Sequence, residues 1–514
     1  MIPGNQEEGS STRFIIALFV TAMLVLITAC GGSSSGNGSD DDTEETDTEQ
    51  EEGSDDEDAD DENGVALPGT EDYEFTELGP IPEASEDFSE DFRPKRLTTT
   101  DDALYFVADE EGGIGPQVWT TDGTDAGTEA LTEIYDDFGQ PHALTTHNGD
   151  LYFMADRRED LMLLDESEPG GVNRILQSIL WYPQAERGEV AITDNTIFFA
   201  MDNTDDPATD GHEVHTVPVG AADPDPESIA NINGEGSSNP DRFTVAGDQL
   251  FFAAQDEDDE ELYEYGLWVT EGAEDGATRL ATIHNYPGDD FFVIMALGDR
   301  VLFRRDASGS GTLSGLDNDP WVSDGTQAGT EPLVADASMT GHFAKLDENT
   351  AIFRAGGAVW KTDGTTEGTE ELLASGSVGS KDNAVLDGKL YYSGSPGVWV
   401  TDGTTEGTEF VTDSGTHQGS TEEMTSPDHF TALDGKIYFT SEFADSDLDG
   451  RHLWVTDGTE EGTRTIAPSV ATNDEPIDAA FDFHFSMEVH DGALYVPAEY
   501  TDEGPKLWQV TPVD

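Results

Sequence analysis

The sequence predicts an all-β fold, a β-propeller of eight or nine four-stranded blades, from three observations. A Trp-x-x-Asp-Gly-Thr motif recurs along the chain, short apolar and aromatic segments recur upstream of it, and long amphipathic helices are not indicated. One four-stranded sheet of about 45 residues cannot bury both of its faces alone, whereas a closed ring of such sheets can. A β-solenoid is the rival architecture, but its coils are much shorter than these units.

The motif is complete in five places, which begin at Trp119, Trp321, Trp360, Trp399 and Trp454. Their Asp-Gly pairs are Asp122-Gly123, Asp324-Gly325, Asp363-Gly364, Asp402-Gly403 and Asp457-Gly458. A weakened copy begins at Trp268, and a last copy at Trp508 stops before any Asp-Gly pair. Two decayed units fit between Trp119 and Trp268, near 161–164 and 213–217. Because the tryptophans share one strand position, we expect them to pack between blades and not to serve as sugar-stacking platforms.

Each unit is interpreted as four strands. In the best example, a short outer strand at 430–433 turns through Asp434-Gly435 into an apolar strand at 437–440, and the Trp454 strand follows. In the hairpin after the tryptophan, the Asp is expected to accept backbone N–H bonds, and glycine is needed wherever φ is positive. The last unit lacks its fourth strand, and the alternating segment 73–78 is expected to supply it and close the ring.

Two stretches, 117–124 and 452–459, carry the motif most fully and resemble the ELWxxDGT repeat family of bacterial exported proteins, which is loosely grouped with hyalin-type repeats. The resemblance covers most of residues 70–514. It departs at the second and third units and at the leading Glu, which is rarely kept. It implies an exported repeat fold and carries no assigned reaction and no catalytic residues.

The N-terminal region is interpreted as an export signal followed by a tether. An apolar run at 14–28 is shorter than a membrane span of about 20 residues and is typical of a signal peptide. The stretch 27–30 resembles the lipobox of bacterial lipoproteins, which implies cleavage before Cys30 and lipidation of Cys30, the only cysteine. We therefore expect a signal peptide at 1–29, a disordered tether at 30–68 and the propeller at 69–514, exported and anchored at the outer membrane, on its periplasmic face or at the cell surface.

The charge balance excludes some partners. The chain has 111 acidic and 22 basic residues, a net charge of −89. Nucleic acid is not expected as a partner, because phosphate binding requires clustered Lys and Arg. The run from Asp40 to Glu62 is acidic, and the rest of the chain also has many more acidic than basic residues. Such self-repulsion is screened at high ionic strength, so a salt-adapted protein from a halophilic or marine organism is expected.

Metal and cofactor signals are weak. Asp445, Asp447 and Asp449, followed by Gly450, match the first half of a calcium loop. The position that holds Glu in an EF-hand loop is Thr456, so a Ca²⁺ site and a solvated acidic loop both stay open, and no cofactor is required. His212 and His215 are expected on opposite faces of a strand, which favours a structural or surface role.

The sequence contains no recognisable catalytic arrangement. We therefore expect a monomeric binding or scaffold module for a protein or a polysaccharide, attached to the membrane through its lipid. One alternative is a hydrolase or lyase that acts on extracellular polymer with carboxylates at a central channel. Another is a structural component of the surface layer.

Overall fold

The computed structural model describes residues 72–79, 94–100, 103–108, 116–132, 141–155, 160–164, 172–176, 190–202, 212–221, 226–229, 232–233, 237–256, 265–272, 276–283, 293–306, 318–376, 378, 383–417, 420–444, 451–466, 487–498 and 506–513. The chain divides into two units, 1–62 and 63–514, and all of these residues belong to the second. Their strands form nine sheets, called blades 1 to 9 in chain order, with one 3₁₀ turn at Asp125–Gly127.

The bounds of the strands in the first five blades are as follows. Blade 1 contains β2 (Lys95–Thr99), β3 (Leu104–Ala108), β4 (Gln117–Thr121) and β5 (Glu129–Ala130). Blade 2 contains β6 (His142–His147), β7 (Asp150–Ala155), β8 (Asp160–Leu164) and β9 (Val172–Leu176). Blade 3 contains β10 (Val190–Ile192), β11 (Thr196–Asp202), β12 (His212–Pro218) and β13 (Glu227–Ser228). Blade 4 contains β14 (Asp241–Ala246), β15 (Gln249–Gln255), β16 (Tyr265–Thr270) and β17 (Thr278–Ile283). Blade 5 contains β18 (Ile294–Leu297), β19 (Arg300–Asp306), β20 (Asn318–Ser323) and β21 (Glu331–Pro332).

The remaining four blades complete the ring. Blade 6 contains β22 (Ala344–Asp347), β23 (Thr350–Ala355), β24 (Ala358–Thr362) and β25 (Glu370–Leu373). Blade 7 contains β26 (Ala384–Leu386), β27 (Lys389–Ser393), β28 (Val398–Thr401) and β29 (Glu409–Thr412). Blade 8 contains β31 (Ser420–Leu433), β32 (Lys436–Phe443), β33 (Arg451–Thr456) and β34 (Arg464–Thr465), to which β30 (Ser414–His417) is added. Blade 9 contains β35 (Glu488–His490), β36 (Ala493–Ala498), β37 (Lys506–Pro512) and β1 (Tyr73–Leu78).

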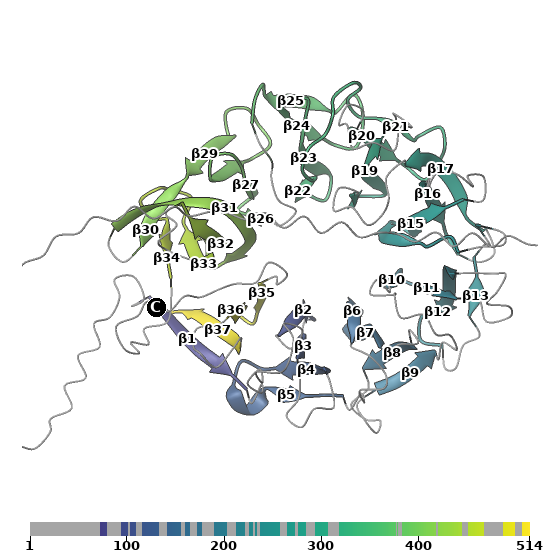
Figure 1. Ribbon diagram of the computed structural model, residues 1–514, viewed down its shortest axis with the longest axis horizontal. Coiled ribbons are helices and arrows are strands. Elements are labelled where there is room, and N and C mark those ends of the chain that lie inside the picture. Colours follow the sequence, from purple (N-terminus) through teal and green to yellow (C-terminus); the bar gives the residue numbers. More distant parts are fainter. Residues whose placement is uncertain are drawn as a thin grey trace, which may run out of the picture. The chain divides into compact units, whose positions relative to one another are not determined.

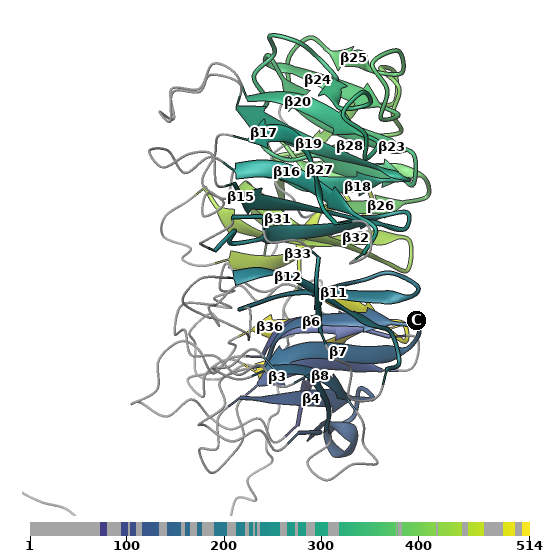
Figure 2. The same ribbon diagram turned by 90° about the vertical axis from the view of Figure 1, so that its right-hand side faces the viewer.

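The predicted fold class is confirmed. Eight blades are four-stranded sheets. The sheet of β30–β34 keeps the same order from β31 to β34, and its extra strand β30 pairs with both β31 and β34, which closes this sheet on itself. The blades are arranged around a centre, and the strands run roughly along the ring axis (Figures 1 and 2). The ring closes as expected, because β1 pairs antiparallel with β37, from Tyr73 opposite Pro512 to Leu78 opposite Leu507.

One expectation about the blade is wrong. The first strand of a unit is the inner strand and not the outer one, because neighbouring blades meet near the centre through their first strands, as in β2 with β6 and β31 with β35. In blade 8 this strand is also long, 14 residues. Antiparallel order therefore places the start of the first strand at one face of the ring. The hairpin between the third and fourth strands lies at the opposite face.

The core lies between adjacent blades. Trp454 of blade 8 belongs to a cluster with Val398 and Val400 of blade 7, and Trp119 of blade 1 packs with Ala493 and Tyr495 of blade 9. Each repeat tryptophan faces the preceding blade, and the full set is Trp119, Trp268, Trp321, Trp360, Trp399, Trp454 and Trp508. This is the arrangement expected from the packing interpretation, because a two-faced apolar sheet needs a neighbour on each side.

The Asp-Gly-Thr hairpin is a hydrogen-bonded turn. In blade 7, Asp402 Oδ1 accepts the Thr404 backbone N–H at 2.9 Å and its hydroxyl at 2.7 Å, and the Gly407 N–H donates to Thr404 Oγ1 at 3.0 Å. Gly403 has a φ of 79°. A Cβ at Gly407 would overlap the Asp402 carboxylate, so both glycines are needed. The same bonds recur in the hairpins of Asp122, Asp324, Asp363 and Asp457.

Candidate functional site: the bulged inner strands

A second repeat, which the sequence interpretation missed, marks the inner strands of four blades. Its pattern is Pro-x-x-[Leu or Phe]-Thr, and it occurs at 94–98, 141–145, 240–244 and 427–431, with a buried proline in each case. These segments begin β2, β6 and β14, and in blade 8 the segment lies within β31, which starts at Ser420. The recurrence of Pro before an apolar residue and Thr is the signal that could have revealed it.

Each copy contains a β-bulge. The pairing of the inner strand with its neighbour shifts between the second and fifth residues of the pattern, as between Asp241 and Thr244 in β14. The third residue has a positive φ: 59° at Arg96, 50° at Ala143, 62° at Arg242 and 54° at His429. Residues other than glycine rarely adopt this conformation, and bulges of this kind redirect side chains next to binding sites.

Blades 4 and 8 carry this feature most strongly. In both blades the residue before the proline also has a positive φ, 45° at Asn239 and 51° at Ser426. Asp241 and Asp428 each accept the N–H of the following residue through their own carboxylate, at 2.8 and 3.0 Å. Two non-glycine residues in the left-handed region at each of these two bulges represent conformational strain, which is concentrated at functional positions in many proteins.

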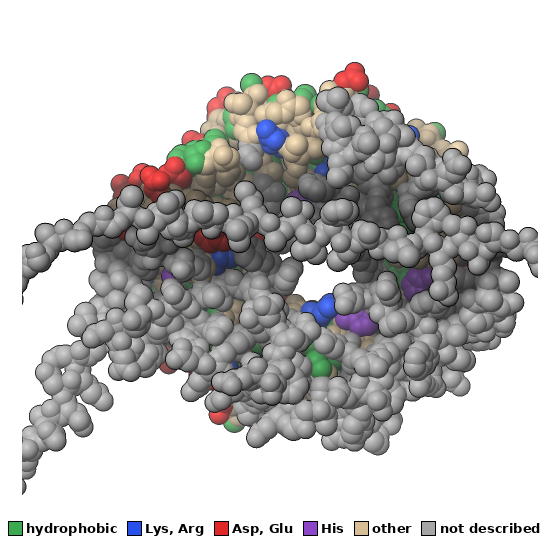
Figure 3. All heavy atoms as spheres, in the orientation of Figure 1, with side chains coloured by type: hydrophobic (Ala, Val, Ile, Leu, Met, Phe, Trp, Pro, Cys, Tyr) green, Lys and Arg blue, Asp and Glu red, His purple; other side chains and the backbone are tan. Residues whose placement is uncertain are grey.

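Basic and imidazole side chains collect along these strands in an otherwise acidic chain. Arg96, Arg242 and His429 occupy bulge positions, and His142 lies at the second position of its copy. In the space-filling view, Lys or Arg and His side chains lie at the margin of the central opening beside β2 and β6 (Figure 3). These strands therefore carry basic side chains in a chain whose net charge is −89, although Asp241 and Asp428 occupy the second position in two of the copies.

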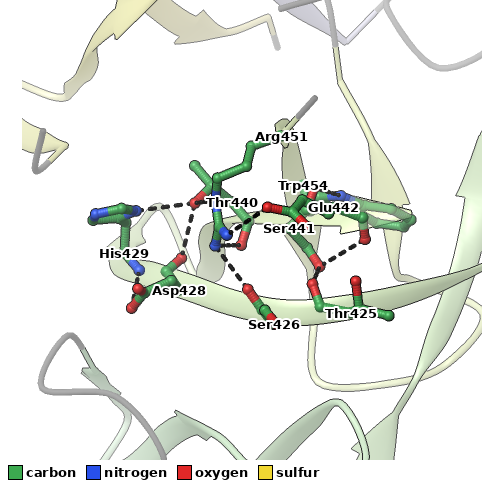
Figure 4. Close-up of polar contacts among 9 residues, drawn as sticks. All are labelled: Thr425, Ser426, Asp428, His429, Thr440, Ser441, Glu442, Arg451 and Trp454. Atoms are coloured by element: carbon green, nitrogen blue, oxygen red, sulfur yellow. Dashed lines mark hydrogen bonds and ion pairs between the residues drawn. The ribbon is translucent and has the colours of Figure 1, made fainter. Parts of the chain in front are cut away.

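A polar network holds the bulge of blade 8 in place (Figure 4). The buried Arg451 guanidinium donates from Nη2 to the Ser426 carbonyl at 2.7 Å and from Nε to Thr440 Oγ1 at 3.2 Å, and it lies 3.6 Å from the Glu442 carboxylate. His429 Nδ1 lies 3.0 Å from the same Thr440 hydroxyl. Burial lowers the pKa of Arg451, and the Asp428 and Glu442 carboxylates oppose that shift.

This network supports positioning more directly than chemistry. Thr440 is 1% exposed, and its hydroxyl is already engaged by Arg451 and His429, so it is not placed to attack a bound substrate. Arg451 binds the carbonyl of Ser426, a residue of positive φ, and so stabilises the unusual backbone of β31. The arrangement can present a fixed inner surface to a ligand.

The leading position of the repeat, two residues before the tryptophan, anchors the segment that follows the third strand. The side chains there accept hydrogen bonds from downstream groups: Gln117 from Thr132 at 2.8 Å, Glu213 from the Ser238 hydroxyl at 2.6 Å, and Asp319 from the Ala337 N–H at 3.0 Å. The Glu213 carboxyl is 1% exposed, and burial raises its pKa to about 7 despite these hydrogen bonds. This finding gives the leading Glu of the repeat a structural role.

The decayed units fall where they were expected, on β8 and β12. In blade 3, His215 pairs with Phe199 as Trp119 pairs with Phe106 in blade 1, so His215 occupies the tryptophan position. It is buried and stacks on Phe199 with ring centroids 6.2 Å apart. This environment is that of a packing residue.

Several predictions fall on residues outside the described ranges. These are the signal peptide 1–29, Cys30, the tether 30–68, and the calcium-loop residues Asp445, Asp447 and Asp449. Within the described ranges, no group of three or more His, Cys, Asp or Glu side chains is placed to hold a metal ion. The same residues include no helix with the length and apolarity required for a membrane span.

Comparison with known proteins gives similarity at the level of solved structures. No protein-family model and no curated protein matches the chain. The chain is similar to a prolyl endopeptidase (11% identity, TM-score 0.40, 80% of this chain and 55% of that one), so it spans about half of that protein. It is also similar to BamB from Moraxella catarrhalis, with 12% identity and a TM-score of 0.36 over 85% of this chain and 98% of that one. A further similar structure is the WD40 domain of SCAP from fission yeast, with 8% identity and a TM-score of 0.41 over 86% of this chain and 99% of that one. At these identities the similarity concerns the fold and does not extend to activity.

Proposed function

We propose that this protein is a β-propeller binding or scaffold module that holds a protein or polysaccharide ligand at the bulges of its inner strands. The proposal includes a lipid anchor at Cys30, an outer-membrane location and adaptation to high salt. The anchor is supported by the apolar run ending at the only cysteine, and the salt adaptation by the net charge of −89.

The observation that carries the binding proposal is the repeated strained bulge. Packing alone does not require a positive φ at Arg96, Arg242 and His429, because the other blades contribute inner strands to the ring without this pattern. A non-glycine residue in the left-handed region costs about 1–2 kcal/mol. The same strain at equivalent positions of several blades is most simply explained by a shared surface at one face of the ring.

The test is capture of envelope components by the intact chain in high salt, followed by chemical cross-linking and mass spectrometry of proteins and glycans. The double variant Arg96→Ala, Arg242→Ala should lose a ligand that the unaltered chain captures. The control is Lys389→Ala, an exposed residue after the turn at the opposite end of an inner strand. Equal capture by the double variant and the control would show that the bulges are not the binding surface.

A further inference from the structure

A groove lies between blades 4 and 5, away from the inner strands. It has a volume of about 350 Å³ and is lined by Arg279 and Thr282 of β17, Arg305 of β19, Trp321 of β20, and Gln327 and Thr330 of the following hairpin. This volume lies within the range of about 300–1,000 Å³ that is typical of small-ligand sites. Two of the few basic side chains of the chain meet in this groove.

Blade 5 departs from the repeat at a residue that lines the groove. In five blades the indole N–H of the repeat tryptophan donates to a carbonyl two residues beyond its cross-strand partner, and these carbonyls belong to Ala108, Ala254, Ala355, Ser441 and Ala498. Arg305 occupies the equivalent position in blade 5. There the buried Trp321 indole nitrogen has no hydrogen-bond partner among the residues that the structure describes. Blade 7 also departs, because its Trp399 indole donates to the Pro396 carbonyl at 2.9 Å, so among the described repeat tryptophans only that of blade 5 has no partner for its indole N–H. A unit that breaks a shared local rule is a candidate for function.

The Arg305 side chain is fixed but has unused hydrogen-bonding capacity. Its guanidinium lies over the Trp321 ring, 4.3 Å from the centroid, and its Nε donates to the Thr282 carbonyl at 3.0 Å. In the described part of the chain, its two terminal nitrogens have neither a carboxylate nor another hydrogen-bond acceptor. Burial lowers the pKa of this guanidinium, because the charged form loses hydration.

The second arginine of the groove is already neutralised. Arg279 Nη1 forms an ion pair with Asp256 at 3.0 Å, and Nη2 donates to the Thr282 hydroxyl at 3.2 Å. The Gln327 side-chain amide nitrogen donates to the Arg279 backbone carbonyl at 3.1 Å. This bond fixes the Gln327 side chain and leaves its amide oxygen to accept a hydrogen bond. The groove therefore combines one uncompensated guanidinium with a hydroxyl and an amide.

We propose that this groove binds a carboxylate-bearing saccharide, with its carboxylate on the terminal nitrogens of Arg305. Two parallel N–H bonds from a guanidinium match the two oxygens of a carboxylate. The sugar hydroxyls would be bound by Gln327 and by Thr282. A bare carboxylate would leave most of the volume and these neutral polar groups unused, and an acidic peptide offers few hydroxyls to match them.

The test is isothermal titration of the intact chain, at a salt concentration where circular dichroism shows it folded. The ligands are a tetramer of galacturonic acid, the matched neutral tetramer of galactose, and tetraglutamate. The key variant is Arg305→Ala, which restores the residue found at this position in blades 1, 4, 6 and 9 and is therefore expected to fold. Lys389→Ala removes the same charge from a distant exposed position and serves as the control.

The tetragalacturonate should bind the unaltered chain and Lys389→Ala equally. Its affinity for Arg305→Ala should be lower by at least about tenfold, the loss expected for hydrogen bonds to a charged group. Tetragalactose should bind more weakly than tetragalacturonate by a similar factor. The proposal is overturned if tetragalacturonate does not bind, if Arg305→Ala binds it like the unaltered chain, or if tetraglutamate binds as tightly. The groove and the inner strands are separate sites, so the result of this titration does not depend on the result of the capture experiment described under the proposed function.

Discussion

The third strand with its hairpin and the start of the first strand differ in how their sequences repeat. The hairpin recurs almost unchanged in five blades. In each, the Asp and both Thr side chains form hydrogen bonds inside the turn, and a Cβ on the second Gly would overlap the Asp carboxylate. The inner strands repeat a looser pattern in four blades, and the residue with positive φ changes from Arg to Ala to His.

This difference separates residues that every copy of the turn requires from residues that change between copies. A residue whose partners all belong to its own turn is constrained in every copy, because each blade must form the same turn. A bulge of this kind fixes the backbone and leaves the residue type open, as the change from Arg96 to Ala143 at equivalent positions shows. We therefore expect the inner strands to determine which ligand is bound and the third strands to stabilise the fold.

The largest effect is expected at the third strand. Trp454 is fully buried, stacks on Phe439 with ring centroids 6.1 Å apart and donates to the Ser441 carbonyl at 3.3 Å. Trp454→Ala should lower the free energy of unfolding by about 3–5 kcal/mol, measured by urea unfolding followed by circular dichroism. The control is Trp321→Ala, because Trp321 is only partly buried and its indole N–H has no partner within the described residues. A loss no larger than that of the control would contradict the packing role.

A smaller, pH-dependent effect is expected at Glu213 in the third strand of blade 3. Burial raises its folded-state pKa from 4.5 to about 7, so the folded chain keeps a proton that the unfolded chain releases between these values. Because the unfolded state then binds fewer protons, stability falls as pH rises through this window and the loss is complete above it.

The comparison with Glu213→Gln isolates this contribution. The stability of the unaltered chain relative to Glu213→Gln should fall by up to about 3 kcal/mol between pH 4.5 and pH 8, measured as paired urea midpoints. Glu423→Gln, at an exposed position of β31, provides the control for removing one carboxylate. A constant difference across this pH range would show that Glu213 is ionised in the folded protein.

The sequence predicted features that depend on one unit and its neighbour. The fold class, the closing strand 73–78 and the two decayed units follow from repeated strands that must bury both faces. The inner bulges were missed because backbone dihedral angles depend on pairing across the blade, and Arg96 or His429 gives no local sign of a positive φ. The Arg305 groove was beyond reach as well, because it combines residues of two blades with one unit's departure from the repeat.

The smallest effect sharpens the comparison most directly, because it should have the opposite sign. Arg96 has a φ of 59° and is exposed, so Arg96→Gly removes backbone strain without opening a cavity. Glycine also increases the entropy of the unfolded chain, so the net gain in unfolding free energy should be only about 0.5–1 kcal/mol. Thr98→Gly in the same strand lacks the positive φ and should destabilise by a similar amount, about 1 kcal/mol. If both substitutions destabilise equally, the bulge is not strained; if Arg96→Gly stabilises the ring while capture of the ligand falls, the inner strand keeps a costly backbone for the sake of its side chain.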